Sequence, residues 1–309
     1  MNFAFVFPGQ GSQSVGMMAA YGDNAVIRDT FDEASGVLGF DLWDMVANGS
    51  AEALNQTINT QPAMLTAGVA VYRLWCAQGG AVPSLMAGHS LGEYSALTCA
   101  GALAFSDALK LVRLRAEAMQ SAVPEGVGAM AAVLGLDDAA IRAVCSEAAQ
   151  GEVLEAVNFN SPGQVVIAGN TAAVNRGCVL AKEKGAKRAL PLPVSVPSHC
   201  ALMLPAAEKL RAAMAAMAVS VPAVPVIHNA DVAVHNDPEA IKDALARQLH
   251  SPVRWVESMQ AFQKQGVELI AECGPGKILA GLNKRILDGV PTWALVDTAT
   301  IMETRDKTS

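Results

Sequence analysis

A serine between two glycines, in the turn Gly88-His89-Ser90-Leu91-Gly92, restricts the possible folds of this chain more than any other segment. An apolar run, Ser84–Ala87, precedes the turn, and Gly92–Ala100 has helical character. In α/β proteins a serine on such a sharp strand-to-helix turn stands out at the edge of the sheet, and flanking glycines let the backbone close. The pattern predicts a nucleophile elbow, although on its own it also fits a plain glycine-rich turn.

The order of the other segments predicts an α/β chain that carries an insertion. Phe3–Phe7 has the apolar character of a buried strand, and Pro8-Gly9 ends it. Outside the insertion we expect helices at 24–38, 62–78, from 106, within 205–217, from 238, after 252 and after 276, and strands at 224–228 and 267–271. The polar tail after about Thr300 is expected to be loose.

The insertion itself has a β-α-β-β-α-β rhythm, which is the ferredoxin-like order. Its strands are expected at 129–134, 153–159, 164–168 and 188–194, and its helices at 138–149 and 171–184. We therefore expect a large α/β domain formed by residues 1–126 and 197–309, and a small ferredoxin-like subdomain formed by residues 127–196.

Composition excludes several classes of protein. Apolar residues make up 52% of the 309 positions and charged residues 17%, as in a folded globular chain. The net charge of −7 argues against a general binder of nucleic acid or anionic membrane. The N-terminus has no signal-peptide pattern, and four prolines break the uncharged run Ala189–Ala207, so no membrane span is expected. The six cysteines are scattered without metal-ligand spacing, which favours reduced thiols in a cytoplasmic protein without metal or cofactor.

Two polar side chains fall on the apolar faces of predicted helices. Arg115 lies in line with Leu111 and Met119, while charged neighbours occupy the opposite face. A buried guanidinium requires a compensating charge, so Arg115 is either a structural ion pair, a side chain that reaches solvent, or a clamp for a substrate carboxylate. Gln248 continues the apolar face of the helix that begins at Pro238, and it must be hydrogen-bonded there, even if only as a core amide.

Five histidines compete for the role of general base: His89, His199, His228, His235 and His250. His89 sits inside the elbow and should point away from the serine, whereas His235 and His250 lie in polar surroundings. His228 ends a strand and is a rival to His199, which precedes a helical segment. A helix N-terminus would favour the neutral imidazole that a base requires. No carboxylate stands out as an orienting partner, so a carbonyl is an alternative.

Acyl transfer to a serine also requires two donors for the oxyanion. The Leu91 backbone N–H, at the start of the helix after the elbow, is one candidate. The Gln10 N–H, in the loop after the first strand, is a second candidate, although that loop also fits an ordinary strand-to-helix turn.

Five longer segments resemble one known family, and they occur in the family's order from residue 3 to about 287. These segments are Phe5–Gln13, Gly88–Leu97, Asn158–Gln164, Val194–His199 and Glu272–Lys277. The family is that of the stand-alone bacterial malonyl-CoA:acyl-carrier-protein transacylases, and the resemblance covers nearly the whole chain. One departure is Cys273, where valine is commoner, and it touches no catalytic position.

The resemblance implies an α/β-hydrolase-like core with a parallel sheet and a ferredoxin-like insertion. It implies that Ser90 is the nucleophile, that His199 is the base and that the carbonyl of Gln248 orients His199. Arg115 would bind the malonyl carboxylate, and the oxyanion hole would fall on the two N–H groups named above. The implied reaction passes malonyl from coenzyme A to acyl carrier protein in fatty acid synthesis.

Three alternatives remain at this point. They are a serine hydrolase that uses the same elbow on water, a non-catalytic module that binds carrier protein, and a related acyltransferase of polyketide synthesis or malonate decarboxylation. A monomer is the default expectation. A basic patch of Lys182, Lys184, Lys187 and Arg188 is a candidate docking surface for carrier protein, although these residues also fit an ordinary solvated face.

Overall fold

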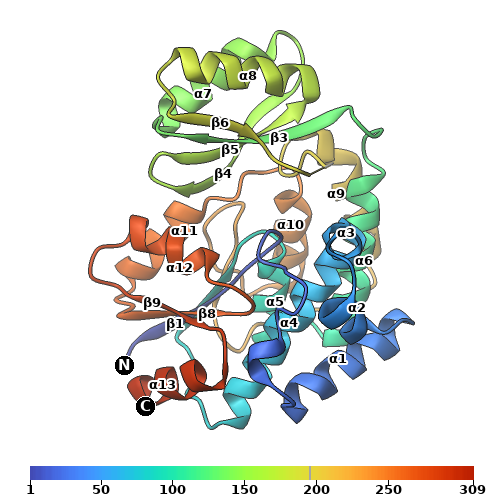
Figure 1. Ribbon diagram of the computed structural model, residues 1–309, viewed down its shortest axis with the longest axis vertical. Helices are drawn as coiled ribbons and strands as arrows, with labels where there is room; N and C mark the ends of the chain where they lie inside the picture. The colour runs from blue at the N-terminus through green and yellow to red at the C-terminus, as the bar shows by residue number, and fades with distance from the viewer. Residues whose placement is uncertain (195) are drawn as a thin grey trace.

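The computed structural model describes residues 1–194 and 196–309. The chain forms two sheets, one in a large lower body and one in a small upper body (Figure 1). Ser195, which belongs to the Val194–His199 segment singled out above, lies outside the described residues. The elbow and the cavity beside it lie where the two bodies meet.

The large body is built on a five-stranded sheet with the order β7-β2-β1-β8-β9, in which every neighbouring pair is parallel. The three central strands are completely buried, as expected for a sheet covered by helices on both faces. The strands are β1 (Phe3–Phe7), β2 (Leu85–Gly88), β7 (Val226–Ile227), β8 (Leu269–Cys273) and β9 (Thr292–Leu295).

Alternate side chains of β1 separate two hydrophobic cores. Phe5 and Phe7 pack with Trp75 and the helices of one face, whereas Val6 packs with Trp255 on the other face. The helices of the large body are α1 (Ala25–Leu38), α2 (Leu42–Asn48), α3 (Ala51–Asn55), α4 (Thr57–Ala77), α5 (Gly92–Cys99), α6 (Phe105–Gln120), α9 (Leu204–Met214), α10 (Pro238–Gln248), α11 (Trp255–Lys264), α12 (Ile278–Ile286) and α13 (Thr298–Thr308).

The small body, here called the small subdomain, runs from Gly128 to Pro191 and has an antiparallel sheet with the order β4-β5-β3-β6. This is the strand order of the ferredoxin-like fold, so the predicted fold class is confirmed. Helices α7 and α8 cover one face of the sheet (Figure 1). Its elements are β3 (Gly128–Leu134), α7 (Asp138–Ala149), β4 (Leu154–Ser161), β5 (Gln164–Asn170), α8 (Thr171–Glu183) and β6 (Arg188–Pro191).

A short backbone connection ties the small subdomain to the large body. The Val253 N–H donates to the Val157 carbonyl at 2.8 Å, and the Phe159 N–H donates back to the Val253 carbonyl at 3.0 Å. The end of β4 is thereby fixed beside the elbow. The expected boundaries at 126/127 and 196/197 fall in the loops on either side of the sheet.

The expectation of a loose tail after Thr300 was wrong. Residues Thr298–Thr308 form α13, whose start is fixed by a capping box between Asp297 and Thr300. The tail is held because Ile301 is completely buried. The fourth helix also begins earlier than expected, at Thr57, so that Pro62 lies inside it and leaves the Ile58 carbonyl without its i→i−4 hydrogen bond.

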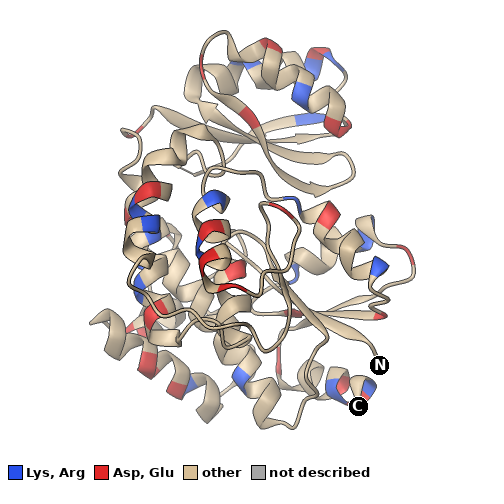
Figure 2. Ribbon diagram, turned by 180° about the vertical axis from the view of Figure 1, so that it is seen from behind, with Lys and Arg blue, Asp and Glu red and all other residues tan. Residues whose placement is uncertain are grey.

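Charged side chains lie mainly on the helices and loops, and the strands of both sheets are nearly free of them (Figure 2). Throughout residues 1–194 and 196–309, none of the helices combines the length and the apolar character that crossing a bilayer requires.

Candidate active site

The elbow holds Ser90 in a strained backbone conformation. Its φ angle is 51°, in the left-handed region that non-glycine residues rarely adopt. The glycines are required by close backbone approach, because a Cβ on Gly88 would lie 1.8 Å from the Gly92 carbonyl carbon, and one on Gly92 would lie 2.0 Å from the Phe7 carbonyl oxygen. The turn therefore brings Ser90 out at the carboxyl end of β2, as the sequence predicted.

Asn229 holds this strained turn from the neighbouring strand. Its side-chain Oδ1 accepts the Ser90 backbone N–H at 2.8 Å, and its Nδ2 donates to the Gly88 carbonyl at 2.7 Å. Asn229 is fully buried just after β7, which pairs with β2. The sequence analysis missed this residue, and the only signal for it is a polar pair, His228-Asn229, at the end of an apolar strand.

Ser90, His199 and Gln248 form a connected line. The Ser90 Oγ lies 2.8 Å from His199 Nε2, and His199 Nδ1 lies 2.7 Å from the main-chain carbonyl of Gln248. That carbonyl accepts a hydrogen bond from the Nδ1–H group. The Nε2 atom is then the unprotonated nitrogen, which is free to accept the serine proton. Burial and the positive charge of Arg115 lower the pKa of His199 to about 3, so the imidazole is neutral at pH 7.

The other histidines do not reach the serine. His89 turns away, as expected, and its Nε2 lies 2.8 Å from Asn160 Oδ1. His228, the rival base, is completely buried with its Nδ1 2.7 Å from Glu93 Oε1. His235 lies 3.0 Å from Asp231, away from the serine. His250 does not line the cavity, so of the five histidines, all of them described, His199 is the one with a ring nitrogen at hydrogen-bond distance from the Ser90 Oγ, as a base requires.

Arg115 points into the site with only 2% of its surface exposed. Its guanidinium donates to Gln61 Oε1 at 2.8 Å, to Gln248 Oε1 at 3.1 Å and to the Ser90 Oγ at 3.3 Å. All of these acceptors are uncharged, and among the described residues the Arg115 Nε has no partner. Arg115 is therefore a buried cation beside the serine with donors available for an anion.

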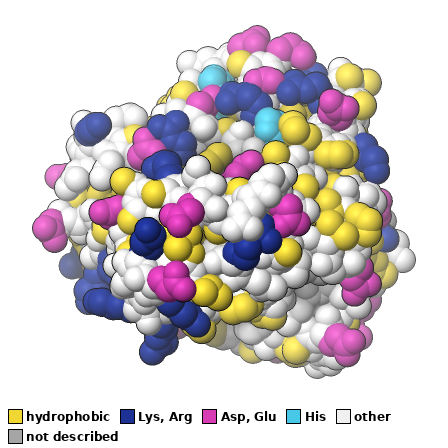
Figure 3. All heavy atoms as spheres, turned by 90° about the horizontal axis from the view of Figure 1, so that it is seen from above, with side chains coloured by type: hydrophobic (Ala, Val, Ile, Leu, Met, Phe, Trp, Pro, Cys, Tyr) yellow, Lys and Arg dark blue, Asp and Glu magenta, His cyan; other side chains and the backbone are white. Residues whose placement is uncertain are grey.

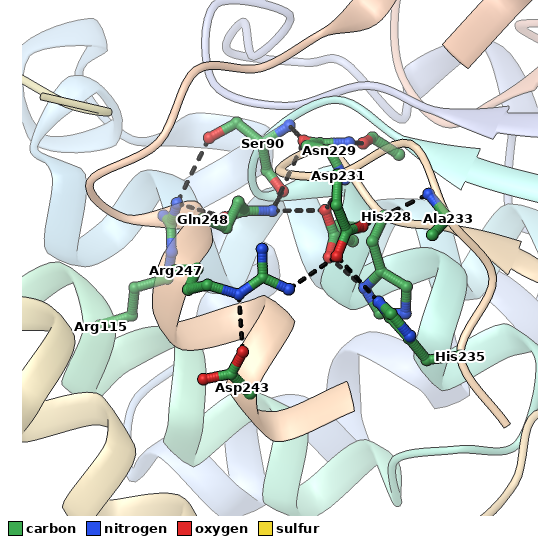
Figure 4. A network of polar contacts seen from close by, with 12 residues as sticks. Ser90, Arg115, His228, Asn229, Asp231, Ala233, His235, Asp243, Arg247 and Gln248 are labelled. Atoms are coloured by element: carbon green, nitrogen blue, oxygen red, sulfur yellow. Dashed lines mark hydrogen bonds and ion pairs between the residues drawn. The ribbon is translucent and has the colours of Figure 1, made fainter. Parts of the chain in front are cut away.

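A second polar layer lies behind these residues. Gln248 Nε2 donates to the Ser90 carbonyl at 2.9 Å and to Glu93 Oε2 at 2.8 Å. Glu93, on α5, is completely buried and also accepts the Asn229 N–H at 2.9 Å. Figure 4 shows Gln248 between Ser90 and Arg115, with Asn229 beside the serine and His228 further back. Glu93 was not singled out by the sequence analysis.

The loop after β1 closes the other side of the site. A Cβ on Gly9 would lie 2.3 Å from the His89 carbonyl and 3.6 Å from the Leu91 nitrogen, so this loop is in direct contact with the elbow. The N–H groups of Gln10 and Leu91 donate to no acceptor among the described residues. Both residues line one cavity of about 360 Å³ together with Ser90, His199 and Arg115.

The small subdomain forms another wall of this cavity through Met130 and Asn158, and Leu192, directly after β6, also lines it. Within residues 1–194 and 196–309, no cluster of three histidine, cysteine or acidic side chains is arranged to hold a metal ion. The arrangement contains an oriented serine, a neutral imidazole, two free N–H groups and a buried cation. These groups can together perform the transfer of an acyl group that itself carries an anion.

The comparisons with known proteins agree with this chemistry. The acyl transferase domain family matches residues 4–299. The malonyl CoA-acyl carrier protein transacylase of Salmonella typhimurium is 58% identical over 300 residues, which cover 97% of each chain. The protein of that name from Bacillus subtilis is 46% identical over 300 residues, covering 96% of this chain and 94% of the relative.

Solved structures extend the likeness to three dimensions. The acyl-carrier-protein S-malonyltransferase of Burkholderia pseudomallei superposes with a TM-score of 0.98 at 59% identity, covering 99% of this chain and 100% of that one. A malonyl-transacylase in complex with its type II PKS acyl-carrier protein gives a TM-score of 0.98 at 52% identity, with coverage of 99% and 100%. This chain therefore belongs to the acyl transferase domain family and, within it, to the malonyl CoA-acyl carrier protein transacylases.

Proposed function

We propose that this enzyme transfers the malonyl group of malonyl-CoA to the phosphopantetheine thiol of an acyl carrier protein through a malonyl ester on Ser90. The observation that carries this proposal is Arg115, a buried guanidinium 3.3 Å from the Ser90 Oγ, whose hydrogen-bond partners among the described residues are all uncharged. Desolvation of an unpaired cation is costly, so the site is suited to an acyl group that brings its own carboxylate.

In the first half-reaction the neutral His199 takes the Ser90 proton while the Oγ attacks the thioester carbonyl. The N–H groups of Gln10 and Leu91 stabilise the oxyanion, and the carbonyl of Gln248 holds the imidazole in the productive tautomer. When the tetrahedral intermediate collapses, the C–S bond breaks, and the His199 imidazolium returns its proton to the leaving thiolate. The products are coenzyme A and malonyl-Ser90.

The second half-reaction reverses these steps with a different thiol. His199 removes the proton of the phosphopantetheine thiol, the sulfur attacks the ester carbonyl, and the C–O bond to Ser90 breaks as His199 reprotonates the Oγ. Arg115 holds the malonyl carboxylate throughout, which fixes the acyl group against the serine. A ping-pong sequence with no cofactor beyond the two thiol carriers follows.

Intact mass spectrometry after addition of malonyl-CoA tests the proposal. The protein should gain the mass of one malonyl group, and Ser90→Ala should gain none. Addition of carrier protein should then remove the adduct and yield malonyl carrier protein. Free malonate released without any thiol acceptor would instead indicate a hydrolase, and the absence of an adduct on the wild-type protein would indicate a non-catalytic binding module.

We further propose that the enzyme acts as a monomer in the cytoplasm. Its six cysteines are unpaired, which is consistent with a reducing compartment. Docking of the carrier on Lys182, Lys184, Lys187 and Arg188 remains a prediction. The Lys184 Nζ already lies 3.6 Å from Glu147 Oε2, so its charge is partly compensated within the chain. Figure 3 shows acidic and basic side chains interspersed over the face seen from above. Charge reversal of the patch should weaken binding of carrier protein without slowing malonyl loading.

A further inference from the structure

Glu93 and His228 form a buried pair that the transfer reaction does not use directly. Both side chains are completely buried, and His228 Nδ1 lies 2.7 Å from Glu93 Oε1. The second carboxylate oxygen accepts the Asn229 N–H at 2.9 Å and a Gln248 side-chain N–H at 2.8 Å. Because this carboxylate is completely buried, the hydrogen bonds from its neighbours fix its position and orientation.

The side-chain amide of Gln248 connects this pair to the cation in the site. Its Nε2 uses one proton on Glu93 and the other on the Ser90 carbonyl, and its Oε1 accepts from Arg115 at 3.1 Å. We call this connection, from Glu93 through the Gln248 amide to Arg115, the amide bridge. An ionised carboxylate only accepts hydrogen bonds and a guanidinium only donates them. Because Glu93 accepts a hydrogen bond from this amide and Arg115 donates one to it, only one orientation of the amide satisfies both ends.

We propose that Glu93 is a positioning residue for acyl-group selection, because it fixes the Gln248 amide so that Arg115 faces the malonyl carboxylate. The inference rests on the proposed function, since it concerns how the same site distinguishes a malonyl group from an uncharged acyl group. The hydrogen bonds of Glu93 go to His228, Asn229 and Gln248, and it does not line the cavity, so it acts only through its neighbours.

A neutral side chain at position 93 would remove this constraint. A glutamine there can donate as well as accept, so the Gln248 amide could turn over and present its NH2 group to Arg115. Two donors would then face each other, and the guanidinium would leave its position beside Ser90. Glu93 also supports Asn229 and hence the elbow, but that effect falls equally on every acyl group. The ratio of malonyl to acetyl loading isolates the contribution of the amide bridge.

The test compares Glu93→Gln with Gln248→Met, which removes the amide and keeps the main-chain carbonyl that orients His199. The matched control is Glu272→Gln, which alters another completely buried carboxylate that caps α12 through the N–H groups of Leu279 and Ala280. For each protein, loading of Ser90 from malonyl-CoA and from acetyl-CoA is followed by quench and intact mass, and the melting temperature is recorded.

Both site variants should lose malonyl loading relative to acetyl loading by about tenfold or more, as expected for the loss of a hydrogen bond to a charged group. The KM for malonyl-CoA should rise more than that for acetyl-CoA. Glu272→Gln should melt earlier with the ratio unchanged. If Glu93→Gln does not fold, Gln248→Met decides alone.

An unchanged malonyl-to-acetyl ratio in the folded site variants would overturn the inference, because a purely structural role lowers both rates together. Failure of the proposed function gives a different result, namely no malonyl adduct on the wild-type protein.

Discussion

Removal of the Arg115 side chain is the most direct test of how the site recognises its acyl group. In Arg115→Ala the malonyl carboxylate would lose a guanidinium that approaches the Ser90 Oγ to 3.3 Å from a position with 2% exposure. A bidentate carboxylate would form two charge-assisted hydrogen bonds there, each worth about 1.5–3 kcal/mol. The combined loss of about 3–6 kcal/mol predicts a fall of roughly 10²- to 10⁴-fold in kcat/KM for malonyl-CoA.

Acetyl transfer should respond differently, because an acetyl group has no carboxylate to lose. We expect kcat/KM for acetyl-CoA to change by less than about tenfold, since the serine, the base and the oxyanion donors keep their positions. The same substitution leaves Gln61 and Gln248 without their Arg115 hydrogen bonds. Each buried amide oxygen left unpaired costs about 1–3 kcal/mol of stability, partly offset because a buried charge is also removed.

The assay is stopped-flow release of coenzyme A from each thioester, with unfolding in urea measured on the same proteins. Arg113→Ala is the matched control, because it removes an arginine from the same helix whose partners, Glu117 and the Leu38 carbonyl, do not line the cavity. That variant should keep both activities. Equal losses of malonyl and acetyl transfer in Arg115→Ala would refute the assignment of Arg115 as the carboxylate ligand.

Three further substitutions test other parts of the site. Gly9→Ala places a methyl group 2.3 Å from the His89 carbonyl, so loading should fall about 10²- to 10³-fold for both acyl groups, while Gly36→Ala, with free space around its Cβ, should not reduce it. Asn229→Ala should slow both acyl groups equally and destabilise the fold by about 1–3 kcal/mol in urea unfolding, because the turn loses its buried clamp. Because the pKa of His199 is about 3 in the folded protein, the base stays unprotonated through pH 6.5. A pH–rate profile of kcat/KM should therefore show no decrease near pH 6.5 that is due to His199. Between pH 6.5 and about 3, unfolded His199 binds a proton and folded His199 does not. The free energy of unfolding should therefore fall by about 1.4 kcal/mol per pH unit as the pH is lowered through this window. His199→Gln should lack this contribution when unfolding is measured as a function of pH.

The fold was predictable where hydrophobic periodicity is strong. The insertion shows clear alternation of strands and helices, and its sheet order is the one expected for that sequence of elements. The C-terminal helix was missed because its exposed face is polar and, of its buried residues Ile301, Thr304 and Thr308, only Ile301 is apolar. Its start signal, Asp297 followed three residues later by Thr300, was present in the sequence but is common in loops as well.

The site was predictable in part, and for a different reason. Arg115 and Gln248 stood out because a polar residue on an apolar helix face is visible from helical spacing alone. Their common target was not visible, since it depends on α6 and α10 converging on the elbow. Asn229 and Glu93 were missed because their contact depends on β7 lying next to β2, a pairing across about 140 positions. No local pattern encodes such a pairing.

The proposed function gives a reason why none of the described carboxylates is hydrogen-bonded to His199. A carboxylate in place of the Gln248 carbonyl would stabilise the imidazolium, as in a triad with an acid. It would also place a second anion close to the malonyl carboxylate and compete for Arg115. Two like charges about 6 Å apart at an effective dielectric constant of 20 repel by roughly 3 kcal/mol, about a hundredfold in binding. A main-chain carbonyl orients His199 without this repulsion, and the nearest buried carboxylate, Glu93, contacts the Gln248 amide at 2.8 Å instead of the imidazole. On the proposed function, Arg115 is the cation kept for the substrate, and burial together with that same charge keeps the His199 base neutral.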